Sequence, residues 1–250
     1  MYEKRWSFKE TSLLIKCDEE RAIDAAIDAS LQARREVEGL IVTNPEFRWS
    51  LEPLELGRKY PRVIELMLKA AGLAEVGPFA AVAGAISQVA AEAALSVGAK
   101  NVIIENGGDI AIAGNQEFRV GIFAGGADGP GKIGFLVRPA ELPIGICTSS
   151  GTVGHSMSFG EADAVTVVAR DAALADAAAT SIANAVKGSD LAESVGRGLE
   201  RAKLIPEIKG CLVIREKYFG AFGKIPELFG PPSSSKIFSE TFEQHKNYGA

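Results

Sequence analysis

The hydrophobic pattern of this chain changes its period after Gly98, and this change restricts the fold more than any other feature. Before Gly98, apolar residues recur at helical spacing over residues 18–42, and residues 62–71 and 81–97 also favour helices. After it come short apolar runs separated by Gly, Asn, Asp and Pro, at 101–105, 109–113, 118–123, 133–137 and 142–147. Such runs are typical of an antiparallel meander. The sequence therefore predicts an α+β fold, a central antiparallel sheet packed with helices.

The flanking segments complete this scheme. A strand is expected at 6–16, ahead of a first helix with Asp18 as its N-cap, and the prolines of 44–61 indicate an ordered loop. The later elements are a strand at 164–169, an alanine-dense helix at 172–186, a helix at 190–202 capped by Ser189, and a hairpin at 210–214 and 218–222 that completes the sheet. We expect one α+β domain over residues 1–224 and an extended or partner-bound tail over 225–250.

Composition narrows the function classes. The 47% hydrophobic content of the 250 residues is enough for one large core. With a net charge of −5, the chain lacks the excess of basic residues that nucleic-acid binding needs, so we expect no nucleic-acid partner. Residues 81–97 are interrupted by Ser87, Gln88 and Glu92, so we expect no membrane span, and nothing near the N-terminus marks export, which favours the cytoplasm. Three widely spaced cysteines and two histidines argue against a disulfide framework, a CxxC site and a His-rich metal centre. The sequence leaves open whether the protein forms a homo-oligomer.

Two glycine-containing segments could bind a ligand. In residues 105–109 (ENGGD), two glycines let the backbone approach a ligand, although a tight turn needs the same residues. In residues 148–156 (TSSGTVGHS), hydroxyls, glycines and His155 could face an anion, although a solvated loop has a similar composition.

Asp176 and Thr180 form a third candidate. Four residues apart on an alanine-rich helix, their oxygens lie on one face, an arrangement that Mg²⁺ can use. The alternative is a structural aspartate that accepts a loop N–H. Residues 76–86 form a turn and a helix start, which could bind a phosphate, but close core packing explains their composition better. Residues 125–131 favour a flexible hairpin loop.

Taken in order, these segments resemble the ApbE family. Residues 81–113 resemble its Leu-Gly-Gly-Ile-Ala-Lys-Gly segment, helix, strand and Gly-Gly-Asp/Glu-Ile. Residues 148–151 resemble its Thr-Ser-Gly, and 165–180 resemble its Val-Thr-Val strand with Ala-Asp-Ala-x-x-Thr. The combination of VGPFAAVAGA, ENGGDI and TSSGTVGHSMSFGEADAV looks more like a short, soluble branch related to ApbE, over nearly the whole chain.

ApbE proteins are Mg²⁺-dependent FAD:protein FMN transferases, and the resemblance implies roles by position. Asp176 and Thr180 would be side-chain metal ligands, with backbone oxygens near Ala179 and from the turn at 84–86. His155 or Asp109 would assist proton transfer. The residues expected to bind FAD or a related nucleotide are Asn106, Gly107, Gly108, Thr148, Ser149, Ser150, Gly151 and Thr152.

The departures from the family pattern keep two functions open. Ser87 and Gln88 stand where the family has Lys-Gly, and its His-x-x-Asp-Pro-x-Thr-Gly signature keeps only His155 in a recognisable place. The first expectation is an Mg²⁺-dependent FMN transferase or nucleotide pyrophosphate-cleaving enzyme. The alternative is a non-catalytic flavin or nucleotide binding protein, and a scaffold that has lost its ligand is a third reading. We expect FAD to bind, with weak or absent FMN transfer, and the ENGGDI turn, the TSSGTVGHS loop and the Asp176 helix to meet in one cleft.

Overall fold

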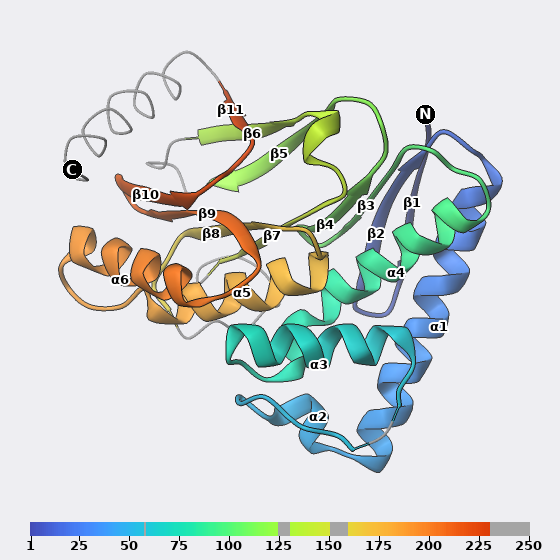
Figure 1. The fold of residues 1–250 in the computed structure, drawn as a ribbon, viewed down its shortest axis with the longest axis horizontal. Coiled ribbons are helices and arrows are strands. Elements are labelled where there is room, and N and C mark those ends of the chain that lie inside the picture. Colours follow the sequence, from blue (N-terminus) through green and yellow to red (C-terminus); the bar gives the residue numbers. More distant parts are fainter. Residues whose placement is uncertain (58, 125–130, 151–159, 231–250) are drawn as a thin grey trace.

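The computed structural model describes residues 1–57, 59–124, 131–150 and 160–230 (Figure 1). The helical segments are α1 (Arg21–Thr43), α2 (Glu46–Trp49), α3 (Arg62–Ala74), η1 (Pro78–Ala81), α4 (Val82–Ser96), η2 (Pro139–Glu141), α5 (Ala172–Ala185) and α6 (Leu191–Leu204). The strands are β1 (Tyr2–Phe8), β2 (Thr11–Cys17), β3 (Val102–Asn106), β4 (Asp109–Ala113), β5 (Phe118–Ala124), β6 (Gly131–Val137), β7 (Ile144–Ser149), β8 (Ala164–Ala169), β9 (Ile208–Arg215), β10 (Tyr218–Gly223) and β11 (Glu227–Phe229).

The described strands form two sheets. Eight strands build an antiparallel sheet in the order β1-β2-β3-β4-β7-β8-β9-β10, and three build a smaller one in the order β11-β6-β5. Figure 1 shows the helices on one face of the large sheet and the small sheet on the other. This confirms the predicted fold class. The expectation of one continuous meander is wrong in part, because the runs at 118–123 and 133–137 leave the large sheet and pair with each other and with β11.

Two hydrophobic cores lie on opposite faces of the large sheet. Along β8, Val165, Val167 and Ala169 join the core under the helices, whereas Ala164 and Val168 join the core under the small sheet. Both faces are covered, so every residue of β8 is buried. The alternation of side chains along a strand therefore decides which core a residue enters.

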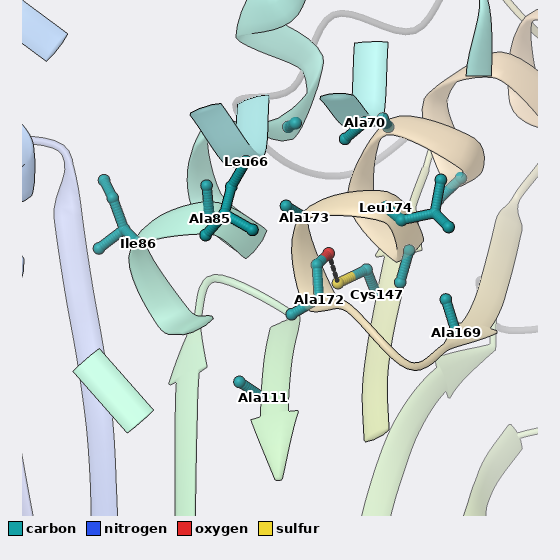
Figure 2. Packing of buried hydrophobic residues seen from close by; sticks show 14 of the residues in the cluster. Leu66, Ala70, Ala85, Ile86, Ala111, Cys147, Ala169, Ala172, Ala173 and Leu174 are labelled. Carbon is teal, nitrogen blue, oxygen red and sulfur yellow. Dashed lines mark hydrogen bonds between the residues drawn. The ribbon is translucent and has the colours of Figure 1, made fainter. Parts of the chain in front are cut away.

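Small residues bring α4, α5 and the sheet close together. A Cβ placed on Gly84 would lie 2.3 Å from the carbonyl oxygen of Ala172, and one on Gly145 of β7 would lie 2.4 Å from the Cα of Ala172. Figure 2 shows this contact region, with Ala85 of α4 near Ala172 and Ala173 of α5. The close core packing expected for the start of α4 is present.

The α4 helix also bears on the membrane question. By length and composition, Pro78–Ser96 could cross a membrane, with a mean hydropathy of 1.4 over its most apolar window. In the fold, however, α4 packs against α1, α5 and β3, as a core helix does. The absence of a membrane span stays a prediction.

Several local expectations need correction. Residues 6–16 are not one strand but the β1–β2 hairpin, which turns at Lys9 with φ of +51°. Asp18 does not cap α1, whose N-cap position is Glu20. Instead, Asp18 accepts the N–H groups of Lys100 (2.9 Å) and Asn101 (3.1 Å), donors that only the tertiary fold brings within reach.

Other differences are smaller. Asp190, and not Ser189, caps α6, since its carboxylate accepts the N–H of Glu193 at 2.9 Å. The expected loop at 44–61 contains the short helix α2. In the tail, β11 pairs with β6 and Leu228 packs on the second core, while residues 231–250 lie outside the described part. Cys17, Cys147 and Cys211 are free, buried thiols.

Candidate functional site

The candidate site lies where β4 begins and β7 ends, on the helix side of the large sheet. Asp109 stands opposite Cys147 in the β4–β7 register, and both side chains share the face of Ala111, which belongs to the helix-side core. The α5 helix packs over this region, because the Cys147 thiol donates to the carbonyl of Ala172 at 3.3 Å. Asp176 lies one helical turn beyond Ala172. The fold thus brings the start of β4, the end of β7 and α5 together.

Asp176 connects α5 to the beginning of α4. Its Oδ2 accepts the N–H of Gly84 at 2.9 Å, while α4 has no capping side chain of its own. Burial raises the pKa of Asp176 to about 7, although hydrogen bonds from the backbone of Gly84 and Ala83 act in the opposite direction. Asp176 therefore caps α4 from another helix, which agrees with the expectation of a structural aspartate that accepts a backbone N–H. Its raised pKa also means that it releases its proton less readily than an ordinary aspartate.

Asp109 shares this tendency. Burial raises its pKa well above the ordinary range, and the negative charge of Asp176 raises it further. The interaction with the Cys147 side chain and a hydrogen bond from the Thr148 backbone oppose the shift. Two carboxyl groups are thus held near each other at a place where ionising both is unfavourable without a compensating cation.

Ser87 and Gln88, which stand where the resemblance has Lys-Gly, hold the helices and sheet together. The Ser87 hydroxyl donates to the backbone oxygen of Asp109 at 2.8 Å. The Gln88 amide donates to Asp171 Oδ1 at 3.1 Å and accepts the N–H of Ala173 at 3.4 Å. Asp176 thus caps α4 while Gln88 binds the first turn of α5. The residue pattern had assigned these two residues no role beyond marking the missing lysine.

The ENGGD segment forms the tight β3–β4 turn. Gly107 and Gly108 have φ of +64° and +105°, which glycine adopts at little cost. The Asn106 amide donates to the carbonyl of Ala83 at 3.4 Å, and its oxygen accepts the N–H of Ser12 at the same distance. In the structure, Asn106 binds protein groups and fixes the turn next to the beginning of α4.

Thr148 and Ser149 point to opposite faces of the sheet. The Thr148 hydroxyl lies 2.9 Å from that of Thr166, on the face of the second core. Ser149 shares the face of Cys147 and Asp109 and is 4% exposed, and its hydroxyl has no hydrogen-bond partner in the described part of the chain. A buried hydroxyl without a hydrogen-bond partner among the described residues calls for an explanation, because buried polar groups are usually paired.

The other candidate residues differ in how well the structure describes them. Thr180 is half-buried one turn after Asp176, and Ala179 is buried between them. Gly84 offers Asp176 an N–H rather than an oxygen, and residues 84–86 belong to α4 rather than to a turn. Ser150 is half-buried, whereas Gly151, Thr152 and His155 lie outside the described residues. Within the described ranges, no group of three or more His, Cys, Asp or Glu side chains could hold a metal.

Sequence reasoning missed the contribution of Cys147 and of the Ser87–Gln88 pair. The available signal was Gly84 among alanines and Gly145 between two isoleucines, positions that indicate close backbone contact. It did not indicate which polar groups that contact would place together.

Comparisons with known proteins agree with this fold. A family model described as AbpE bacteria matches residues 3–200. A UPF0280 protein of Methanocaldococcus jannaschii is 42% identical over 229 residues, covering 91% of this chain and 93% of its own length. A UPF0280 protein of Methanothermobacter thermautotrophicus is 46% identical over 199 residues, covering 79% and 77% respectively.

Solved structures of ApbE proteins have a similar fold. Flavin transferase ApbE from Vibrio cholerae superimposes with a TM-score of 0.59 at 15% identity, over 88% of this chain and 96% of that one. The apo flavinyl transferase ApbE of Pseudomonas stutzeri gives 0.54 at 12% identity, over 95% and 96%. At these identities the likeness is one of fold.

Proposed function

Because the chain belongs to the AbpE bacteria family and holds Asp109 near Asp176, we propose that it binds a flavin dinucleotide or related nucleotide together with Mg²⁺. The observation that carries the proposal is this pair of carboxyl groups from β4 and α5. Its support is electrostatic, since a cation between them would relieve the repulsion that burial intensifies. Solved proteins with this fold are named flavin transferases, which makes a flavin nucleotide the first ligand to test.

The donor groups suit Mg²⁺ better than other common metals. Mg²⁺ prefers oxygen ligands, and it usually binds one or two carboxylates together with water and substrate phosphate. Asp176, Asp109 and the Thr180 hydroxyl are oxygen donors, and an all-protein cage of three or more acidic or soft ligands is absent from the described residues. When bound, Mg²⁺ would neutralise charge on the pyrophosphate of the nucleotide.

The groups around the carboxyl pair have roles in binding. The Ser149 hydroxyl can donate to a phosphate or ring oxygen, because the described protein offers it no other partner. The Gly107-Gly108 turn lets the backbone approach a ligand closely. Asn106 acts by holding this turn against α4.

Transfer would require one proton step from this chain. An acceptor hydroxyl would lose its proton as it bonds to the FMN phosphorus, while the bond to the AMP phosphate breaks and AMP leaves. In its ionised form, which a bound cation would favour, Asp109 is the carboxylate among the described residues that we assign to receive that proton. We therefore keep an FMN transferase or pyrophosphate-cleaving enzyme as the first function.

Binding without turnover is the second function, favoured by one observation. Ser87 and Gln88 are uncharged and donate hydrogen bonds to the Asp109 backbone and to Asp171, so neither supplies the positive charge that lysine would bring to the phosphates. Both functions need the same ligand, and they differ only in whether the bound nucleotide then reacts.

The test is calorimetric titration of FAD, FMN and ADP with and without Mg²⁺, on the wild type and on Asp176→Asn and Asp109→Asn. We expect Mg²⁺-dependent binding that falls at least about tenfold in both variants. Asp171→Asn is the matched control, since Asp171 precedes α5 at its N-cap position and its carboxylate accepts a hydrogen bond from Gln88. Equal affinity in all four proteins would contradict the proposed site.

Activity separates the two functions. An assay for FMN attached to an acceptor protein, together with AMP release from FAD, reports turnover. Mg²⁺-dependent product would establish the enzyme, and binding without product would establish the binding protein. No affinity for any of the three nucleotides would remove both.

A further inference from the structure

Three side chains of α2 and η1 form a stacked cluster, here called the Arg48 stack. The Arg48 guanidinium carbon lies 4.8 Å from the ring centroid of Trp49 and 5.7 Å from that of Phe79. Arg48 and Trp49 come from α2, and Phe79 comes from η1. None of these residues has a role in the site described above.

The Arg48 stack is fixed to the body of the protein. Phe47, the neighbour of Arg48 on α2, is fully buried in the helix-side core. The carbonyl of Ser50, just after α2, lies close against Gly77, the residue before η1. A Cβ on Gly77 would lie 1.7 Å from the Ser50 carbonyl oxygen. The two segments that carry the rings are therefore held in contact with each other.

The same segment leads directly to the carboxyl pair. The η1 turn continues without a break into α4, whose Gly84 N–H binds Asp176. It also packs against α5, the helix that carries Asp176 and Thr180. Figure 1 shows α2, α3 and α5 together on the helix side of the molecule. The Arg48 stack is thus joined through η1 to the end of α4 that Asp176 caps.

The stack leaves both an aromatic ring and a guanidinium group available at the surface. Trp49 is 63% exposed, so its ring stays largely accessible to solvent although Arg48 lies over it. In the described residues, Arg48 makes no ion pair and its side chain donates no hydrogen bond. A guanidinium with unused donors suits a phosphate, and an accessible indole suits a planar ring.

We propose that the Arg48 stack is a subsite for an aromatic ring of the nucleotide and the phosphate next to it, with Trp49 stacking on the ring and Arg48 binding the phosphate. This inference rests on the proposed function, because it requires a nucleotide at the carboxyl pair. It also supplies a positive charge at a site where Ser87 occupies the expected position of lysine. The ring is adenine or isoalloxazine, and ADP and FMN distinguish the two.

The experiment compares Trp49→Ala, Arg48→Gln and Leu51→Ala in titrations with FAD, ADP, FMN and inorganic pyrophosphate, all with Mg²⁺. Trp49→Ala should weaken FAD, and one of ADP or FMN, by at least about fivefold and leave pyrophosphate unchanged. Arg48→Gln should weaken pyrophosphate as well. Leu51→Ala is the control, since Leu51 is 66% exposed two residues away and offers no ring.

A second readout reports on the ring itself. The chain has two tryptophans, so Trp6→Phe leaves Trp49 as the sole indole, and ADP or FMN should change its emission with the same Kd as calorimetry. Unchanged FAD affinity in Trp49→Ala would overturn the inference and leave the proposed function standing. Equal losses in Trp49→Ala and Leu51→Ala would overturn it in favour of a general apolar surface. If the wild type binds no nucleotide, both proposals fail.

Discussion

Asp176 joins a structural and a chemical role in one carboxyl group. It accepts the N–H of Gly84 at the beginning of α4, and burial raises its pKa to about 7. Because the folded protein holds this proton more tightly than the unfolded chain, folding takes up a proton between about pH 4 and pH 7. Stability should therefore fall as pH rises through that window and level off above it.

Asp176→Asn should remove this dependence, since asparagine keeps an oxygen acceptor for Gly84 and carries no charge. We expect the variant to exceed the wild type by about 1–3 kcal/mol in free energy of unfolding at pH 8 and to differ little at pH 4.5. Urea unfolding across this range measures the difference. Asp109 adds a pH dependence of the same sign to the unfolding free energy of both the wild type and the variant. A difference independent of pH would show that the change acts on packing.

Ser149 permits a second test at this scale. Its buried hydroxyl has no partner within the described chain, so Ser149→Ala should leave the ligand-free protein as stable or raise its unfolding free energy by about 0.5–1.5 kcal/mol. Nucleotide affinity should fall in the same variant. Calorimetry and urea unfolding provide the two measurements.

Thr148→Val is the contrasting change on the adjacent residue. It breaks the hydroxyl pair with Thr166 on the other face, so it should cost about 1 kcal/mol of stability and leave nucleotide affinity unchanged. Loss of affinity in Thr148→Val but not in Ser149→Ala would reverse the assignment of faces.

At the scale of elements, the contact between α4 and α5 positions the site. Gly84 allows the α4 backbone to touch Ala172, and the two helices exchange hydrogen bonds near their N-termini through Asp176 and Gln88. Any side chain on Gly84 must push α4 away from α5 and from Asp176.

Gly84→Ala should therefore destabilise the protein by about 2–4 kcal/mol, since the added Cβ would lie 2.3 Å from a backbone oxygen that cannot move freely. Gly72→Ala on α3 is the matched control, because nothing lies within 4 Å of its Cβ position and alanine favours the helix by up to about 1 kcal/mol. Thermal unfolding of both variants measures the contrast. Similar melting temperatures for the two would contradict the close contact.

At the scale of the whole molecule, the large sheet is shared by two cores, and the second depends on a segment near the C-terminus. Leu228 of β11 and Ile225 pack on this core, and β11 pairs with β6. The proposed domain boundary at residue 224 would separate these residues from the sheet they cover.

A chain truncated after Lys224 should lose about 2–4 kcal/mol of stability relative to one truncated after Gly230, because it exposes apolar residues of the second core. Equilibrium unfolding of the two truncated proteins and the full chain measures this. Equal stability of the two truncated forms would place the boundary at 224 as first expected and make β11 dispensable.

Local pattern was enough to predict the fold class and most element positions. Helical periodicity located α1, and small-residue or alanine-rich composition located α4 and α5. Short apolar runs next to turn residues located β3, β4 and β8 within a residue or two. The order of segments also indicated the family. The fold class and the element positions depend on interactions between residues close in sequence, which composition and spacing record directly.

The tertiary structure alone decided how these elements use their polar groups. Asp18 and Asp176 accept N–H groups more than 80 residues away in the chain, and no local motif specifies such partners. Strand pairing also decided that β5 and β6 form a separate sheet, and that Thr148 and Ser149, adjacent in sequence, serve opposite faces. Long-range contacts select among arrangements that the local pattern leaves equally favourable, and the carboxyl pair is one result of that selection.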